Sequence, residues 1–321
     1  MVGCYEAVSV EFTKAGGFMS LAVKTRELSK HFGDFVAVDR LNLEIETGEV
    51  CAFLGPNGAG KTTTIRMLCG LLSISSGSAT VLGLDIRRDS EKIKRHIGYM
   101  SQKFSLYEEL SVAENLDFYA GLYSLRGKEK KRRRQEMISL SGLEGREDEP
   151  VNGLSRGFKQ RLALACAVIS SPALLFLDEP TSGVSPSSRR AFFDLIRKLS
   201  LSGTTVIVST HFMDEAERCD RIAFFNQGKL LALDSPARLK SSALEGRLLE
   251  LEVEDPFSAI PRVQNLPGVK DISIHGRFLH VLAGDGFDQP ALEALVQTKA
   301  RIISPGLDDV FVALARKRES R

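Results

Sequence analysis

The feature that most constrains the fold of this 321-residue chain is the glycine-rich stretch GPNGAGKTT at residues 55–63. The positions that define the phosphate-loop pattern GxxxxGK[ST] are filled by Gly55, Gly60, Lys61 and Thr62. Glycines let successive backbone N–H groups converge on an anion, while a helix N-terminus and a lysine add positive charge. An apolar run at 49–54 precedes the stretch and a helical pattern at 61–72 follows it. The sequence therefore predicts an α/β domain that binds a nucleoside triphosphate.

A second stretch, ALLFLDEP at residues 173–180, places two carboxylates at the end of an apolar strand. In phosphoryl-transfer sites of this class a strand-end aspartate holds Mg²⁺, so we predict that role for Asp178, with the hydroxyl of Thr62. Glu179 is placed to orient and polarise the attacking water, a role that contributes roughly 10²–10⁴-fold in rate. The alternative is an acidic turn on the surface, and the upstream phosphate loop argues against it.

Three more features complete an ordered set. Gln102 follows an apolar strand at 97–100, an LSRG stretch occupies 154–157, and His211 follows a strand at 206–210. With the phosphate loop and the acidic strand end, this set resembles the nucleotide-binding domain of ATP-binding cassette (ABC) transporters over about residues 21–240. The resemblance implies a P-loop NTPase fold of the ABC type with a helical subdomain at about 103–170. It also implies ATP and Mg²⁺ as cofactors, and hydrolysis of ATP.

The resemblance also assigns residues to the nucleotide. The loop that would contact it comprises Gly55, Pro56, Asn57, Gly58, Ala59, Gly60, Lys61, Thr62 and Thr63. Phe32 falls where the family stacks an aromatic ring on adenine, and such stacking is worth roughly 1–3 kcal/mol per base. A phenylalanine of the core is the alternative for that position.

Catalytic roles follow from the same resemblance for Lys61, Gln102, Glu179 and His211. Gln102 would sense Mg²⁺ and the attacking water, and His211 would contact the γ-phosphate. In the family two domains meet head to tail around ATP. The resemblance therefore implies that Ser155 and Gly157 act on the nucleotide of a second subunit.

Two positions depart from the family pattern. Arg156 stands where the Leu-Ser-Gly-Gly stretch usually has glycine, and Ser185 stands where the loop after the acidic strand usually has aspartate. Two hypotheses remain open: tolerated drift in a working ATPase, or a slow site that depends on a more active partner domain.

Composition narrows the setting of the chain. The 43 basic and 41 acidic residues nearly balance, so nothing suggests bulk binding of nucleic acid. The five scattered cysteines indicate a reduced, cytosolic protein rather than a disulfide framework. No apolar run approaches the roughly 18 residues that a membrane-spanning helix needs. The family resemblance then implies peripheral attachment to separate membrane permease subunits at the cytoplasmic face of the inner membrane, with a second ATP-binding subunit in a homodimer or heterodimer.

Two segments of the helical subdomain have alternative interpretations. Residues 103–110, KFSLYEEL, are apolar for a connecting loop. They either receive the permease or pack within the subdomain. The basic run KEKKRRR at 128–134 is either a solvated helix face or a contact with anionic lipid headgroups.

The two ends of the chain differ in pattern from the nucleotide-binding segment at about 21–240. Residues 1–20 show no clear periodicity, and we expect a disordered extension or a native start at Met19. Residues 241–321 show the order β-α-β-β-α-β-α, which predicts a small ferredoxin-like accessory domain. This tail resembles the accessory domain of daunorubicin-resistance-type exporter ATPases, and it implies export rather than import.

The resulting prediction is an ATP-hydrolysing motor subunit of an ABC exporter. Two alternatives stay open. One is a soluble ABC ATPase that is not coupled to transport, although the single phosphate loop and the lack of sustained heptads argue against it. The other is a nonhydrolysing, ATP-dependent clamp, against which Glu179 and His211 argue.

Overall fold

The computed structural model describes residues 20–242 and 244–319. The expectations for an N-terminal extension and a start at Met19 lie outside these residues. Within the described ranges, no helix combines the length and the apolar character needed to cross a membrane. The predicted division of the chain at about residue 240 stays a prediction.

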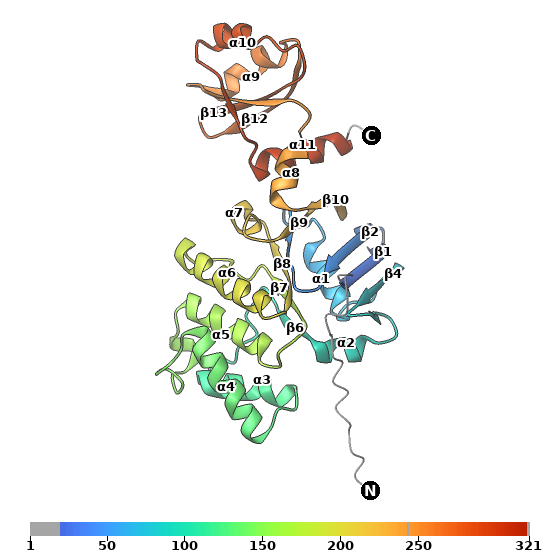
Figure 1. Cartoon of the computed structure of the whole chain (residues 1–321), viewed down its shortest axis with the longest axis vertical. Helices are drawn as coiled ribbons and strands as arrows, with labels where there is room; N and C mark the ends of the chain where they lie inside the picture. The colour runs from blue at the N-terminus through green and yellow to red at the C-terminus, as the bar shows by residue number, and fades with distance from the viewer. Residues whose placement is uncertain (1–19, 243, 320–321) are drawn as a thin grey trace.

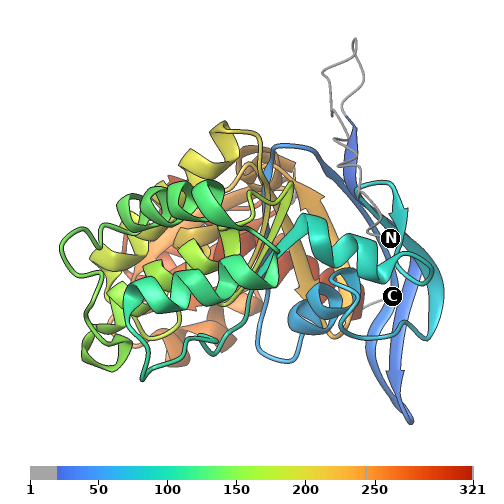
Figure 2. The same ribbon diagram turned by 90° about the horizontal axis from the view of Figure 1, so that it is seen from below.

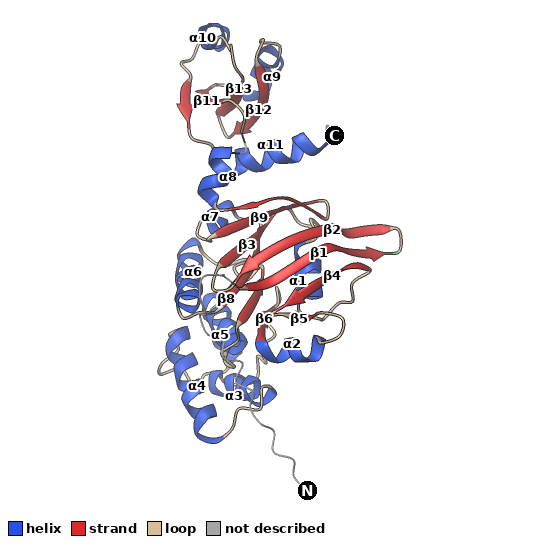
Figure 3. Cartoon of the chain, turned by 45° about the vertical axis from the view of Figure 1, so that its right-hand side comes forward, coloured by secondary structure: helices blue, strands red, loops and turns tan. Residues whose placement is uncertain are grey.

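A six-stranded sheet with the order β10-β9-β3-β8-β7-β6 forms the centre of the molecule (Figure 3). Its strands are β3 (Val50–Leu54), β6 (Ile97–Met100), β7 (Leu174–Asp178), β8 (Thr205–Thr210), β9 (Arg221–Asn226) and β10 (Lys229–Asp234). All neighbouring strands run parallel except β10, which is antiparallel to β9. Every residue of β3, β7 and β8 is buried, as expected for parallel strands covered on both faces. This burial explains the continuous apolar runs of the sequence.

A second, antiparallel sheet with the order β2-β1-β4-β5 lies beside the first, and it was not part of the sequence prediction (Figure 2). It consists of β1 (Leu21–Phe32), β2 (Phe35–Glu46), β4 (Ser76–Val81) and β5 (Leu84–Asp85). Helix α1 (Lys61–Leu68) contacts β2 and β4 as well as β7. The predicted extension of this helix to residue 72 is not seen, because Gly70 adopts a left-handed φ of 67° just after its end.

Helices cover the other side of the central sheet or pack on the helices that do (Figures 1 and 2). These are α3 (Val112–Leu122), α4 (Gly127–Ser141), α5 (Arg156–Val168), α6 (Pro186–Leu201) and the short α7 (Met213–Ala216). A short helix, α2 (Ser90–His96), leads into β6, and a 3₁₀ turn (Val151–Gly153) precedes α5. Helix α3 starts with a capping box in which Ser111 and Glu114 exchange hydrogen bonds. Helices α3, α4 and α5 pack on one another within the range predicted for the helical subdomain.

The basic run in α4 is largely paired within the chain. Lys130 and Arg134 form ion pairs with Asp117, and Arg132 and Arg133 form ion pairs with Glu136. The guanidinium of Arg133 also donates to the last carbonyls of α5. These contacts support the interpretation of a structural, solvated helix face over that of a lipid contact.

The C-terminal elements follow the predicted order. They are β11 (Arg247–Glu252), α9 (Pro256–Gln264), β12 (Val269–His275), β13 (Phe278–Ala283), α10 (Gln289–Val296), β14 (Arg301–Ile303) and α11 (Leu307–Glu319). The four strands form an antiparallel sheet with the order β12-β13-β11-β14, the arrangement of a ferredoxin-like unit. Helix α8 (Pro236–Ser242) leads to this sheet, and α11 lies beneath it against α8 and β10 (Figure 1).

Candidate nucleotide-binding and hydrolysis site

The phosphate loop connects β3 to the first turn of α1. At Gly60, the N-cap of α1, φ is 98°. A Cβ atom there would lie 2.6 Å from the carbonyl oxygen of Ala37. Only glycine satisfies both the left-handed backbone and this close approach. The loop is therefore shaped by β2 as well as by its own residues.

Lys61 is buried at the start of α1, with 4% of its surface exposed. Its Nζ donates to the carbonyl oxygens of Gly55 at 2.7 Å and Pro56 at 3.0 Å. Burial lowers the pKa of this ammonium group, while the carboxylates of Glu179 and Asp178 oppose that change. The chain thus holds a cation within the curve of the loop, where a phosphate would meet it.

Hydroxyl and carboxylate oxygens gather at the carboxyl end of β7. The hydroxyls of Thr62 and Ser209 donate to Asp178 Oδ1 at 2.8 and 2.7 Å. Oxygen donors of this kind are the ligands that Mg²⁺ prefers. Ser209 was not predicted from the sequence. The signal for it was a polar residue near the end of an otherwise apolar strand, one position before Thr210.

Glu179 is the point on which the predicted catalytic residues converge. Its carboxylate accepts a hydrogen bond from Gln102 Nε2 at 3.2 Å and lies 3.9 Å from Lys61 Nζ. His211 Nδ1 lies 3.7 Å from the same carboxylate. The structure therefore brings together Lys61, Gln102, Glu179 and His211 from four different parts of the chain.

A buried glutamate that the sequence did not reveal supports this arrangement. Glu215, in the short helix α7, is 1% exposed and accepts hydrogen bonds from the hydroxyls of Thr181 and Thr210. Burial raises the pKa of Glu215, and the two hydroxyls and Arg189 oppose the rise. Thr181 lies two residues after Glu179, and Thr210 directly precedes His211. Glu215 therefore ties together the two loops that carry these side chains.

A cavity of about 300 Å³ opens next to the phosphate loop. Its lining comprises Phe35, Ala37, residues 57–63, Gln102 and Glu179. The aromatic ring in this lining belongs to Phe35, whereas Phe32, the residue predicted to stack on adenine, is not part of it. Phe32 faces Phe35 across the β1–β2 hairpin, is half exposed, and has Lys30 Nζ 5.0 Å from its ring centroid.

Ser155 and Gly157 are not part of this cavity lining. They lie at the N-terminus of α5, next to the start of α6, where a Cβ on Gly157 would be 3.1 Å from Ser188 Oγ. Ser185 accepts a hydrogen bond from the backbone N–H of Ser188 and thereby caps α6. The guanidinium of Arg156 packs on Gly183. Arg156, the first residue of α5, thus contacts the loop that leads to Ser185, the N-cap of α6.

A second cavity, of about 400 Å³, shares Gln102 with the first in its lining. It is lined by Gln102, Lys103, Phe104, Leu106, Glu108, Leu154, Arg156 and Lys159. Phe104 and Leu106 also pack in part against the main core, which agrees with packing within the subdomain, whereas reception of the permease stays a prediction. Tyr107, by contrast, is exposed and packs its ring on that of Phe118, another exposed residue.

Comparisons with known proteins agree with this geometry. Residues 38–182 match the family described as ABC transporter. The chain is 36% identical over 304 residues to the daunorubicin/doxorubicin resistance ATP-binding protein DrrA of Streptomyces peucetius, covering 91% of this chain and 92% of that protein. It is 33% identical to the Nod factor export ATP-binding protein I of Sinorhizobium fredii, covering 92% and 86% of the two chains.

A higher identity, 47% over 235 residues, is found with the probable multidrug ABC transporter ATP-binding protein YbhF of Escherichia coli. That match covers 73% of this chain but only 41% of the relative. Among solved structures, cbiO1 from Clostridium perfringens superposes with a TM-score of 0.65 at 30% identity, covering 69% of this chain and 91% of that one. A dimeric ATP-binding cassette bound to ADP and Pi gives a TM-score of 0.61 at 27% identity, covering 66% and 98%.

Proposed function

The chain belongs to the ABC transporter family of ATP-binding proteins, and we propose that it is the ATP-hydrolysing motor subunit of an exporter that acts through separate membrane permease subunits. Domains of this family hydrolyse ATP. The observation that carries the proposal for this chain is the convergence of Lys61, Gln102 and His211 on the carboxylate of Glu179.

The side chains fit ATP and Mg²⁺ by their chemistry. The oxygens of Thr62 and Asp178 form a hard-ligand pair, and the amide oxygen of Gln102 would join them at the metal. Mg²⁺, when bound, would neutralise charge on the phosphates. Lys61 would exchange its two loop carbonyls for phosphate oxygens. Glu179, oriented by Gln102, would orient the attacking water and accept its proton, and His211 would contact the γ-phosphate.

The positions of Ser155 and Gly157 support a head-to-tail dimer. Ser155 is exposed and makes no side-chain capping bond to α5. It is therefore available to a nucleotide held by another subunit. A related cassette solved as a dimer with ADP and Pi supports the same assembly. The partner would be a second copy of this chain or a different motor subunit.

The second cavity supports a permease contact. It adjoins Gln102, so a segment seated there would touch a residue that also contacts Glu179. Tyr107, which precedes α3, and Phe118 and Leu122 of α3 add exposed apolar side chains to the helical subdomain. An apolar surface of this kind is typical of a docking site. We infer peripheral attachment at the cytoplasmic face of the inner membrane.

Export as the direction rests on the relatives. The names of two of them describe drug resistance and Nod factor export, and both matches extend over more than 90% of this chain. Import relatives and soluble cassette ATPases are the competing classes, and vesicle transport assays with the reconstituted permease would separate them.

The test compares purified wild type with Glu179→Gln in ATP and Mg²⁺. We expect the amide to lower kcat by roughly 10²–10⁴-fold, because it cannot accept the proton of water. ATP binding should remain, and gel filtration should show an ATP-dependent dimer. Glu129→Gln, an exposed position on α4, is the matched control and should retain wild-type turnover. Wild-type rates in Glu179→Gln would remove Glu179 from catalysis. A wild-type chain that binds ATP but neither hydrolyses it nor dimerises would favour the slow-site or clamp alternative.

A further inference from the structure

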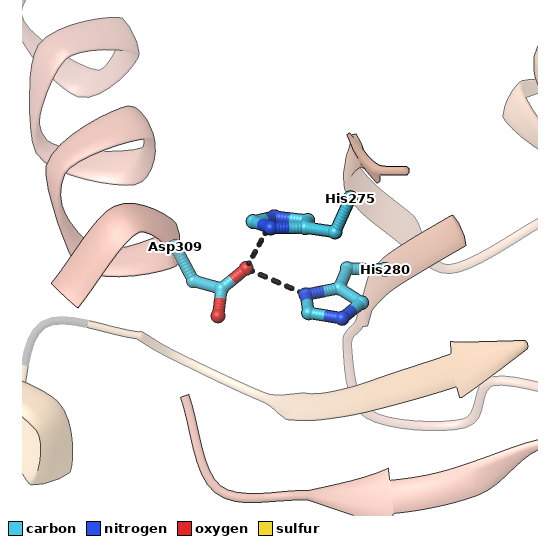
Figure 4. Close-up of side chains that lie close together, drawn as sticks. All are labelled: His275, His280 and Asp309. Atoms are coloured by element: carbon cyan, nitrogen blue, oxygen red, sulfur yellow. Dashed lines mark hydrogen bonds and ion pairs between the residues drawn. The ribbon is translucent and has the colours of Figure 1, made fainter. Parts of the chain in front are cut away.

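Two imidazoles and a carboxylate meet far from the nucleotide site, at the junction of the accessory sheet with α11 (Figure 4). His275 ends β12, His280 lies in β13, and Asp309 lies in the first turn of α11. Asp309 Oδ1 is 2.8 Å from His280 Nδ1 and 3.2 Å from His275 Nε2. His280 and Asp309 are buried, and the two imidazole rings stack with centroids 4.0 Å apart.

The spacing of these three donors matches that of ligands on one small cation. Donors of a tetrahedral Zn²⁺ site, with Zn–N and Zn–O distances of about 2.0–2.2 Å, lie about 3.3 Å from one another. The three candidate ligand atoms all lie within 4.8 Å of one another. Two imidazoles and one carboxylate form a donor set that favours zinc and neighbouring transition metals over Mg²⁺ or Ca²⁺.

Outer partners hold the candidate ligands in place. Glu250 Oε2 lies 3.5 Å from Nε2 of His280, the ring nitrogen that would not bind the metal. The backbone N–H of Gly306 donates to Asp309 Oδ2 at 2.8 Å, which leaves Oδ1 facing the imidazoles. A carboxylate behind a ligating histidine fixes the ring and its tautomer in many metal sites. The cluster therefore has an orienting shell as well as ligands.

A cavity of about 10 Å³ adjoins the cluster. Asp271, Ser273, His280 and Asp309 supply its polar lining, together with apolar residues of β11, β13 and α11. Its size is close to that required by a single water molecule. This leaves room for one small fourth ligand and none for an organic molecule.

We propose that His275, His280 and Asp309 bind a divalent transition-metal ion of the Zn²⁺ type, with one water as the fourth ligand. The metal would fasten the β12–β13 hairpin to α11. Helix α11 also packs into the main core through Leu307 and Val310, and the ring centroid of Phe311 lies 5.6 Å from that of Phe224 in β9, with the rings tilted by 41°. Occupancy of the site would thus stiffen the link between the accessory sheet and the motor.

The test is metal titration of the full-length, chelator-treated and nucleotide-free protein. We expect wild type to bind one equivalent of Co²⁺ with the visible absorption of a four-coordinate ion, which Zn²⁺ displaces. Zn²⁺ should also raise the melting temperature. Half-buried His275 tolerates truncation, so His275→Ala should stay folded, lose the signal and show no metal-dependent melting shift. Glu250→Gln should weaken binding by roughly 10–100-fold.

The double variant His31→Ala/His96→Ala is the matched control, because it removes two exposed histidines outside the cluster. It should bind metal like wild type. Absence of stoichiometric binding by folded wild type would overturn the proposal. Equal affinity in wild type and folded His275→Ala would also overturn it.

Discussion

At the scale of single residues, the backbone conformation of Glu179 determines the direction of its carboxylate. Its φ is 46°, in the left-handed region that non-glycine residues avoid at a cost of roughly 1–2 kcal/mol. Its backbone N–H donates to Ser209 Oγ at 2.9 Å, and the next carbonyl, that of Pro180, accepts from buried Gln160 at 2.9 Å. These bonds offset the strain and turn the carboxylate towards Gln102 and Lys61.

Truncating the buried Glu215 tests whether it positions the catalytic loops. Glu215→Ala leaves the hydroxyls of Thr181 and Thr210 without their shared acceptor and removes the ion-pair partner that lies 3.3 Å from Arg189 Nε, so we expect the free energy of unfolding to fall by about 3–5 kcal/mol. Glu215→Gln keeps the shape and should cost less. In Glu215→Gln, kcat for ATP hydrolysis should fall by a larger factor than the affinity for ATP, because Glu215 supports the loops that carry Glu179 and His211 rather than the phosphate loop. An unchanged kcat in folded Glu215→Gln would show that the tie is dispensable.

Either Phe35 or Phe32 could supply the ring that stacks on adenine, and single substitutions distinguish them. Phe35 lines the cavity beside the phosphate loop, so we expect Phe35→Ala to weaken ATP binding by about 1–3 kcal/mol. Tripolyphosphate, which lacks the base, should bind both proteins equally in calorimetry. Phe32→Ala is the matched comparison. If it alone lowers ATP affinity, the position predicted from the sequence is the stacking residue.

At the scale of elements, the close packing of β6 on α5 fixes where Gln102 emerges. A Cβ on Gly98 of β6 would lie 2.3 Å from the carbonyl oxygen of Ala167 in α5 and 2.9 Å from Leu175 Cδ1 in β7. The strand therefore approaches the helix through a residue without a side chain. Two residues beyond the end of β6, the chain delivers Gln102 to Glu179.

We therefore expect Gly98→Ala to destabilise the protein by about 1–3 kcal/mol through overpacking. It should also lower ATP turnover, since β6 must shift. Gly121→Ala is the control, because a Cβ there in α3 meets nothing within 4 Å. That change should stabilise by about 0.5–1 kcal/mol, as alanine favours a helix over glycine. Urea unfolding measures the stability of both variants. A Gly98→Ala protein as stable as Gly121→Ala would contradict the packing argument.

At the scale of the whole molecule, the last helix returns to the core of the motor. Leu307 and Val310 of α11 belong to the same buried cluster as Leu175, Leu177 and Phe224 of the central sheet. The accessory sheet meanwhile has a core of its own around Leu251 and Val281. Helix α11 therefore packs into the main core, while Asp309 on the same helix contacts His280 of the accessory sheet.

Leu307→Ala should destabilise the protein by about 2–5 kcal/mol, because this leucine is 1% exposed and its loss leaves a cavity. Leu201→Ala, at a position 77% exposed, should stay within about 0.5 kcal/mol of wild type. Denaturant unfolding followed by far-UV circular dichroism compares the two. A wild-type midpoint for Leu307→Ala would mean that α11 does not share the core of the motor.

The sequence by itself determined the features that depend on neighbouring residues. The phosphate loop, the acidic end of β7 and the order of the C-terminal elements follow from glycine placement, apolar runs and alternation, so they were predictable. The family resemblance then located Gln102 and His211. The structure places both beside Glu179, and their roles stay predictions.

Only the tertiary structure decided what long-range pairing brings together. The pairing of β1 with β4 joins residues that are far apart in the sequence, for example Val23 with Val81, and no local period encodes it. In the sequence Glu215 cannot be distinguished from an exposed helical glutamate, and only the structure shows it buried between Thr181 and Thr210. His275, His280 and Asp309 likewise meet only because a hairpin and the final helix pack together. Local patterns depend on adjacent side chains, whereas convergent sites depend on packing between distant elements.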